Sequence, residues 1–299
     1  MNLFEKLKTN PQTPSLDVKK GYFVVDDSIG ISLLTAINYY QNKGKYLLVT
    51  SNLYKAQSIY SSICSFVPEG GQVLPIDSSE EARLMDKEDY LVDFSTGEWN
   101  NSFFLANGYK NGNPFNCYWK RSAGALEDGV LKLNLFKEGD RYYGAEYRSS
   151  RNEFHYGYYA TRMKSASCSG VISSFFTYTY YPCWDEIDIE FLGKDSTKVQ
   201  FNYYSNGQGN HEYVYNLGFD ASLDFHEYGF EWLPDSITWY VDGYKVYRAT
   251  KDIPSNPQHI MMNLWNQKGQ DAWAGAFDET KLPVQAQYEF IAYVPVDVD

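Results

Sequence analysis

Three carboxylates occupy every second position of one short segment. Glu186, Asp188 and Glu190 alternate with two isoleucines and a phenylalanine over residues 186–191. Strict alternation of polar and apolar residues is typical of a β-strand with two chemically opposite faces. The segment therefore predicts a strand that packs its apolar side chains inward and presents three acids on its other face.

The spacing of these acids suits glycoside cleavage. The Cα atoms of Glu186 and Glu190 would lie roughly 13 Å apart along a strand, and on a curved sheet their carboxyl groups can lean toward the about 5–5.5 Å separation of retaining glycosidases. Three like charges repel, and the repulsion is relieved when one acid holds a proton. A neutral acid then lies beside an ionised nucleophile, which is the division that glycoside cleavage requires.

Alternating acids also occur on solvated strand faces, and that is the competing interpretation. The flanking sequence argues against it, because residues 171–206 read VISSFFTYTYYPCWDEIDIEFLGKDSTKVQFNYYSN. Aromatic residues crowd the acids on both sides, and flat rings stack on the faces of sugars. The segment therefore indicates chemistry on a carbohydrate.

Five segments carry a resemblance to a known family: 171–178 (VISSFFTY), 184–195 (WDEIDIEFLGKD), 197–204 (TKVQFNYY), 217–222 (LGFDAS) and 261–266 (MMNLWN). From about residue 90 to the end, the chain resembles the bacterial lichenases, the 1,3-1,4-β-glucanases of a family that also holds laminarinases and κ-carrageenases. Laminarinases of that family have one extra residue between the aspartate and the second glutamate. The unbulged spacing here favours the lichenase branch.

The resemblance implies a retaining endo-β-glucanase and orders the roles of the acids. Glu186 would attack the anomeric carbon, and Glu190 would protonate the departing oxygen and then activate water. Asp188 would maintain the distribution of protons and charge at the site through a hydrogen bond to Glu186. No cofactor is needed for catalysis, and the expected partner is a mixed-linkage β-glucan polysaccharide.

Further residues are predicted to bind this polysaccharide. Trp184 would share the face of the acids at the entrance of their strand and stack on a sugar, with a place in the core as the alternative. The remaining candidates match lichenase groove positions or alternate on one strand face: Asn116, Glu146, Arg148, Phe176, Tyr178, Asn202, Tyr204, Asn263 and Trp265, with Trp273 as a weaker candidate.

The chain departs from the lichenase pattern in a loop and at a metal position. The loop between Tyr178 and Trp184 is shorter than is usual in lichenases, where it shapes one side of the groove. Lichenases also tend to hold a structural calcium ion with one aspartate near the C-terminus and two backbone carbonyls. Glu289 stands at that position here, and a glutamate can ligate calcium through oxygen.

The cysteines depart from the pattern as well. Lichenases commonly pair a cysteine that matches Cys117 with another at the position of Gly144, so this bridge is predicted to be absent. Pairing of Cys117 with Cys168 or Cys183 stays open, because sequence alone does not set connectivity.

Composition and charge exclude several classes of protein. The net charge of −12 and the isoelectric point near 4.8 argue against nucleic acid as a partner of the β domain, since phosphates demand a basic surface. Residues 1–20 contain no apolar run long enough for a signal-peptide core, although the resemblance implies an extracellular enzyme. No stretch approaches the ~20 apolar residues of a membrane span. A monomer is expected.

Residues 1–88 differ from residues 89–299 in the type and order of their predicted secondary-structure elements. Their strand, helix, strand, helix order over 21–66 is α/β in character. The segments LLVTSNLYKAQSIYSSICSF and VLPIDSSEEARLM resemble part of the opening module of bacterial transcription-repair coupling factors, a nucleotide-binding fold with a degenerate phosphate loop. No G-x-x-x-x-G-K-[ST] motif is present. A small α/β appendage without catalytic role is predicted, joined through a linker over 77–89.

Residues 89–299 read as short β runs separated by turns. Residues 130–135 alternate cleanly, and the runs 237–241 and 244–247 flank Asp242-Gly243, a sequence suited to a two-residue hairpin turn. Many strands at this spacing predict an all-β jelly-roll sandwich, concanavalin-like, of two antiparallel sheets. The three acids would lie on its concave sheet.

Three other functions are alternatives to the predicted 1,3-1,4-β-glucanase. A non-catalytic β-glucan-binding lectin could use the same sandwich, because a fold does not fix a function. A laminarin-type 1,3-β-glucanase is the alternative among enzymes. In the third, residues 1–88 would be the functional part, as a partner-docking or nucleic-acid module.

Overall fold

The computed structural model describes residues 90–180 and 182–296 of the chain. These residues belong to one compact unit, Lys87–Asp299. The predicted α/β segment at 1–88 and the linker at 77–89 lie outside the described residues. No helix in the described part has the length and hydrophobicity needed to cross a membrane.

The described residues are mostly strands. The strands are β1 (Tyr90–Asp93), β2 (Phe103–Leu105), β3 (Tyr118–Trp119), β4 (Gly124–Glu127), β5 (Val130–Glu138), β6 (Arg141–Ser149), β7 (Gly157–Lys164), β8 (Val171–Tyr178), β9 (Glu186–Leu192), β10 (Lys198–Tyr204), β11 (Tyr213–Asn216), β12 (His226–Leu233), β13 (Ser236–Val241), β14 (Tyr244–Ala249), β15 (His259–Asn266) and β16 (Val284–Pro295). The helical elements are the 3-10 turns η1 (Phe94–Thr96), η2 (Arg121–Ala123) and η3 (Glu279–Lys281) and the short helix α5 (Asp271–Ala274).

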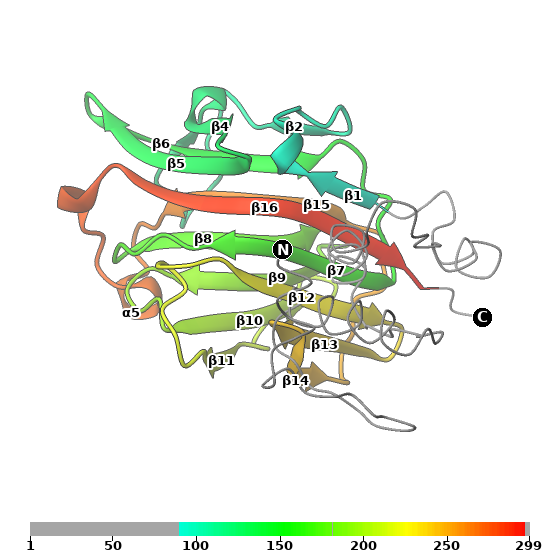
Figure 1. Ribbon diagram of the computed structural model, residues 1–299. Helices are drawn as coiled ribbons and strands as arrows, with labels where there is room; N and C mark the ends of the chain where they lie inside the picture. Colours follow the sequence, from blue (N-terminus) through cyan, green and yellow to red (C-terminus); the bar gives the residue numbers. More distant parts are fainter. Residues whose placement is uncertain (1–89, 181, 297–299) are drawn as a thin grey trace, which may run out of the picture. The chain divides into compact units, whose positions relative to one another are not determined.

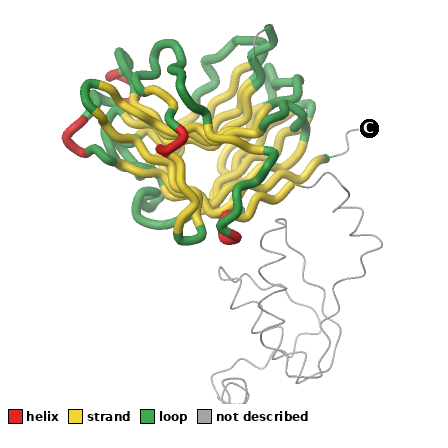
Figure 2. The backbone as a smooth tube through the Cα atoms, turned by 90° about the horizontal axis from the view of Figure 1, so that it is seen from above, coloured by secondary structure: helices red, strands yellow, loops and turns green. Residues whose placement is uncertain are grey.

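Two antiparallel sheets form a sandwich (Figures 1 and 2). One sheet has the order β11-β10-β9-β8-β15-β6, and the other has the order β5-β16-β7-β12-β13-β14. The β5–β6 hairpin joins them, because β5 pairs with β16 at one end and with β6 at the other. Strand β3 is the exception to antiparallel pairing, since it runs parallel to β6. The predicted jelly-roll sandwich is confirmed.

The core lies between the two sheets, and the inner face of β9 contributes to it. Both isoleucines of this strand and Phe191 are fully buried, and the ring of Phe191 meets Tyr228 of β12 with 4.8 Å between centroids. Burying such a side chain contributes about 1.5–3 kcal/mol. The indole N–H of Trp239, on β13, donates to the backbone carbonyl of Asp188 across 3.1 Å. With its apolar face held in this way, β9 must turn the three acids outward.

The predicted hairpin at Asp242-Gly243 is also confirmed. Val241 at the end of β13 pairs with Tyr244 at the start of β14. Asp242 and Gly243 both have positive φ, at 48° and 76°. Two left-handed residues in a two-residue loop match the twist of the flanking strands.

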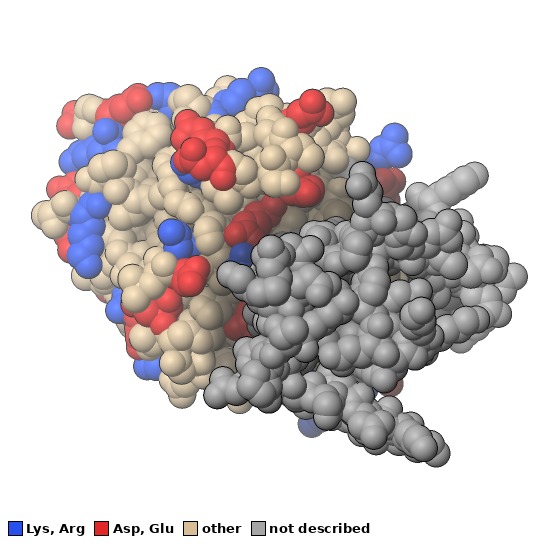
Figure 3. Space-filling model, in the orientation of Figure 1, with Lys and Arg blue, Asp and Glu red and all other residues tan. Residues whose placement is uncertain are grey.

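Charge on the described surface is mixed. On the face shown in Figure 3, acidic and basic side chains are interspersed, and the described part of that face carries no continuous basic patch. The absence of a nucleic-acid partner for the β domain stays a prediction.

Candidate active site

Strand register gathers residues that are far apart in the sequence into rows across the β9 sheet. Glu190 lies between Ser174 of β8 and Gln200 of β10. Beyond Ser174, the same row continues to Asn263 of β15 and Glu146 of β6. Paired residues on neighbouring strands point to the same face of a sheet. One row therefore carries the acid, two amides and a second glutamate.

Two further rows run parallel to this one. The row of Asp188 joins residues of five strands: Arg148, Met261, Phe176, Asp188 and Asn202. The row of Glu186 joins residues of four strands: His259, Tyr178, Glu186 and Tyr204. Each predicted catalytic acid thus has aromatic or amide neighbours that only strand pairing supplies.

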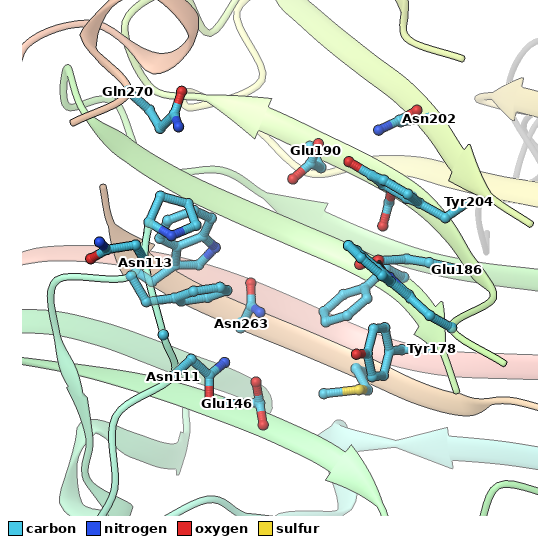
Figure 4. A pocket seen from close by; sticks show the side chains of 18 of the residues that line it. Asn111, Asn113, Glu146, Tyr178, Glu186, Glu190, Asn202, Tyr204, Asn263 and Gln270 are labelled. Carbon is cyan, nitrogen blue, oxygen red and sulfur yellow. Dashed lines mark hydrogen bonds between the residues drawn. The ribbon is translucent and has the colours of Figure 1, made fainter. Parts of the chain in front are cut away.

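The rows form the floor of a cleft of about 1040 Å³. This volume slightly exceeds the range of roughly 300–1,000 Å³ for small-molecule sites and leaves room for several sugar rings. In Figure 4, Glu186 and Glu190 project into the cleft from β9, and Asn202 and Tyr204 flank them from β10. The predicted residues that line it are Glu146, Arg148, Phe176, Tyr178, Trp184, Glu186, Asp188, Glu190, Asn202, Tyr204, Asn263, Trp265 and Trp273.

Trp184 lines the cleft but does not lie in the strand of the acids. Strand β9 begins at Glu186, and the backbone of Trp184 has φ of 39°, in the left-handed region. Its carbonyl accepts a hydrogen bond from the Gly207 amide at 2.8 Å. The side chain is 41% exposed, which rules out the core alternative. The expected shared strand face is corrected to a turn before the strand.

Asn116 is not among the residues that line the cleft. The loop just before it, at residues 111–115, forms one wall. The backbone N–H of Asn116 pairs with the carbonyl of Asn266 across 2.9 Å. The substrate-binding role of Asn116 therefore stays a prediction, and its neighbours in the loop line the cleft.

Sequence reasoning missed part of the lining. The missed residues are Tyr109, Asn111, Gly112, Asn113, Pro114, Phe115, Tyr180, Gln200, Glu212, Met261 and Gln270. Strand alternation could have identified Gln200, which lies two residues before Asn202, and Met261, which lies two residues before Asn263. The others come from loops or strand ends, where no periodic signal exists.

Burial raises the pKa of all three acids on β9. The pKa of Glu186 rises to about 7, and the pKa of Asp188 rises well above its usual range. The hydrogen bond between the two carboxyls raises the pKa of Asp188 and lowers that of Glu186. The indole N–H of Trp184 donates to Oε2 of Glu186 at 2.9 Å and also lowers its pKa. Asp188 therefore keeps its proton and donates it in this hydrogen bond, and Glu186 is the carboxyl prepared to ionise.

Glu190 holds its proton to higher pH than Glu186. Burial is the largest cause, and the charges of Glu186 and Glu212 add to it, so that the pKa of Glu190 rises to about 8. The amide of Gln200 opposes this shift, since its Nε2 donates to Oε2 of Glu190 across 3.0 Å. Near neutral pH the site can thus hold a protonated Glu190 beside an ionised Glu186.

A fourth acid lies at the far end of the Glu190 row. Glu146 is only 2% exposed, and burial raises its pKa to about 7. The guanidinium of Arg148, 3.6 Å away, and hydrogen bonds from Asn263 and Tyr109 lower this pKa and so limit its rise. This end of the cleft combines charge with several hydrogen-bonding groups, which suits sugar hydroxyls.

Asp185 anchors the entrance of the catalytic strand. Its carboxylate is fully buried and accepts from the backbone N–H groups of Asn206, Ser255 and Asn256 at 2.7, 2.9 and 3.0 Å. The side-chain amide of Asn256 adds a fourth bond at 2.9 Å. Two loops are thereby tied to the residue before Glu186. The sequence carried a signal for this role, because an acid at 185 falls on the inward face of the alternation.

The surroundings of Glu289 do not fit the expected calcium site. Glu289 is the extra residue of a bulge in β16, and its Oε2 lies 2.5 Å from Nη1 of Arg162. The other guanidinium nitrogen of Arg162 donates to the Phe225 carbonyl at 3.1 Å. A cation already neutralises the carboxylate that would ligate calcium. The described residues also contain no cluster of three or more His, Cys, Asp or Glu suited to a metal ion.

The cysteines of the described residues are free thiols. Cys117, Cys168 and Cys183 have no disulfide partner there. A Cβ atom built on Gly144 would lie 2.8 Å from the sulfur of Cys117. The two positions that lichenases commonly bridge are therefore adjacent, and the glycine removes the second sulfur.

The antiparallel sandwich carries three acids of unequal proton affinity on one sheet, along an aromatic-lined cleft. This arrangement is typical of a glycosidase. A sequence profile of glycosyl hydrolases family 16 matches residues 111–287. The "Beta-glucanase" of Acetivibrio thermocellus is 48% identical over 235 residues, which cover 75% of this chain and 67% of that protein. The "Beta-glucanase" of Paenibacillus polymyxa is 49% identical and covers 67% of this chain and 84% of its own. The chain belongs to glycosyl hydrolases family 16.

Solved structures agree with this assignment. A prokaryotic β-1,3-1,4-glucanase (lichenase) derived from a mouse hindgut metagenome is 48% identical, with a TM-score of 0.67, covering 70% of this chain and 99% of that one. A laminarinase from Flavobacterium is 20% identical, with a TM-score of 0.60, over 69% of this chain and 98% of its own. The second comparison establishes the shared fold alone.

Proposed function

We propose that this chain is a retaining endo-β-glucanase that hydrolyses mixed-linkage 1,3-1,4-β-D-glucan. The observation that carries the proposal is the pair Glu186 and Glu190, which share one face of β9 in one cleft. Their proton affinities differ in the direction that double displacement needs.

In the first step, the ionised carboxylate of Glu186 attacks the anomeric carbon. The glycosidic C–O bond breaks, and its electron pair goes to the departing oxygen, which takes the proton of Glu190. Asp188 keeps its proton and donates to Glu186, which steadies the carboxylate before attack. A covalent glycosyl-enzyme is left on Glu186.

In the second step, Glu190 is ionised and acts as a base. It removes a proton from a water molecule, whose oxygen attacks the anomeric carbon from the face that the leaving group vacated. The bond to Glu186 breaks and returns the nucleophile to its ionised state. Two inversions at the same carbon retain the β configuration.

The preference for mixed-linkage glucan is supported by two features. The relatives near 48% identity are beta-glucanases, and the related solved structure is a 1,3-1,4-glucanase, whereas the laminarinase shares only 20% of its residues. The spacing from Asp188 to Glu190 also lacks the extra residue of the laminarinase pattern. Laminarin is therefore the poorer substrate in this proposal.

Release of reducing ends from lichenan, laminarin and carboxymethylcellulose tests the substrate. The expected order places lichenan far above the other two. A Glu186→Gln variant should lose turnover, and Glu190→Gln should fall by about 10²–10⁴-fold. Binding to lichenan without release of reducing ends by the wild-type chain would instead support the lectin alternative.

Azide tests the two roles separately. With an activated aryl glycoside, Glu190→Ala plus azide should give a β-glycosyl azide, because azide replaces water on the covalent intermediate. Glu186→Ala plus azide should give the α-glycosyl azide, because azide replaces the nucleophile. The opposite pattern would reverse the two assignments.

A further inference from the structure

We infer that Gln200 and Trp273 are positioning residues that determine which oxygen of Glu190 carries the catalytic proton. The inference rests on the proposed role of Glu190 as acid and base. Nε2 of Gln200 donates to Oε2 of Glu190 across 3.0 Å, and the indole Nε1 of Trp273 donates to Oε1 of Gln200 across 3.1 Å. The three side chains form a chain of hydrogen bonds from a loop to the acid.

The direction of this chain is set by the indole. A tryptophan N–H can only donate, so the oxygen of the Gln200 amide must face it. The NH₂ group then faces Glu190. If the amide were flipped, its NH₂ group would face the indole N–H of Trp273, and its oxygen would face Oε2 of Glu190. Trp273 thereby removes the ambiguity that an amide side chain otherwise has.

The consequence falls on the carboxyl of Glu190. Oε2 accepts an N–H, so it behaves as the carbonyl oxygen of the neutral acid, and the proton resides on Oε1. After the proton has left, the same N–H stabilises the carboxylate that activates water. One amide therefore serves both halves of the double displacement without moving.

The tertiary structure holds both positioning residues in place. Gln200 is only 6% exposed, so water competes little for its amide. Trp273 lies in the short helix α5, where its backbone N–H donates to Gln270 at 3.1 Å and its ring packs near Trp265 with 6.2 Å between centroids. The ammonium of Lys194 also donates to the backbone carbonyl of Trp273.

The other titratable groups that face Glu190 are acidic. They are Glu186 and Asp188 on its own strand, Tyr204 on β10 and Glu212 before β11. Each favours the protonated form of Glu190 when charged. Gln200 is the group that favours the carboxylate. Removal of the Gln200 amide should therefore raise the pKa of Glu190.

Two variants test the inference: Gln200→Met, which keeps side-chain length without an amide, and Trp273→Phe, which keeps a ring without the N–H. kcat/KM is measured against pH on barley β-glucan and on an aryl β-glycoside with a good leaving group. The alkaline limb, which reports the general acid, should move up by about 0.5–1 pH unit in Gln200→Met and less in Trp273→Phe. kcat/KM on the glucan should fall about 10–100-fold, and on the activated substrate by less than about threefold.

A Gln200→Glu variant strengthens the test. Its carboxylate can still accept from Trp273 but places a negative charge beside Glu190, so the alkaline limb should move further than in Gln200→Met. An unmoved alkaline limb, or equal losses on both substrates, would overturn the inference and leave Gln200 as a sugar-binding or structural residue. Retained glucan cleavage by Glu190→Gln would instead contradict the proposed function. Circular dichroism and thermal unfolding of each variant exclude a folding defect.

Discussion

Trp184 donates its indole N–H to Oε2 of Glu186 across 2.9 Å. The same ring stacks on Tyr204 with 5.0 Å between centroids and 13° between planes. Tyr204 in turn pairs with Glu186 in the register of β9 and β10. The proposed nucleophile is therefore held between a donor from the preceding turn and an aromatic wall from the neighbouring strand.

Replacement of Trp184 by Phe should raise the pKa of Glu186, since the lost hydrogen bond lowers that pKa in the wild type. Glu186 must be ionised to attack, so the acid limb of kcat/KM should move to higher pH. kcat/KM at pH 6 should fall roughly tenfold. Trp99→Phe is the matched control, because Trp99 is 45% exposed and does not line the cleft. An acid limb at the wild-type position in Trp184→Phe would contradict the role of this donor.

Asp185→Asn should destabilise the domain by about 2–4 kcal/mol. The substitution removes the buried charge that accepts four hydrogen bonds and turns an NH₂ toward backbone donors. Urea unfolding measures the change. Asp195→Asn is the control, because Asp195 makes comparable bonds to Thr197 at an exposed turn and should cost less than about 1 kcal/mol. Equal losses in both variants would show that burial of Asp185 is unimportant.

Glu146→Gln should stabilise the protein at pH 8 but not at pH 5. Burial raises the pKa of Glu146 to about 7 in the folded state. Between the ordinary pKa and this value the folded state binds a proton that the unfolded state lacks, so stability falls as pH rises through this window. The glutamine avoids this cost, and its advantage should grow by about 1–3 kcal/mol from pH 5 to pH 8.

The control for this pH dependence is Glu153→Gln. Glu153 is an exposed partner of Arg151 at 3.5 Å, so its replacement should change stability by the same small amount at both pH values. Chemical denaturation at each pH gives both differences. A Glu146→Gln advantage that did not vary with pH would mean that the buried carboxyl titrates normally.

Millimolar calcium and EDTA should leave the melting temperature of the wild-type protein unchanged. The reason is the ion pair of Glu289 with Arg162 at 2.5 Å, which occupies the carboxylate. Arg162→Gln removes the competing cation, and calcium should then raise the melting temperature of the variant. A rise of several degrees with calcium in the wild type would show that the ion displaces the guanidinium.

The sequence by itself determined the all-β sandwich and the face of β9 that carries the acids. Both depend on local periodicity: alternation at 186–191 specifies which side chains are buried, and Asp242-Gly243 specifies a tight turn. Phe176 and Tyr178 were recognisable for the same reason, as alternate residues of one strand. Such signals are short-range, so they can be recognised in the sequence without knowing which strands pair across the sheet.

Only the tertiary structure decided what surrounds the acids. The pairing of β9 with β10 places Gln200 beside Glu190, and the short helix α5 after β15 supplies the indole that orients its amide. Glu289 matched a family position, yet its carboxylate is neutralised by Arg162. Contacts of this kind depend on long-range pairing and packing, which no periodicity within a single segment encodes.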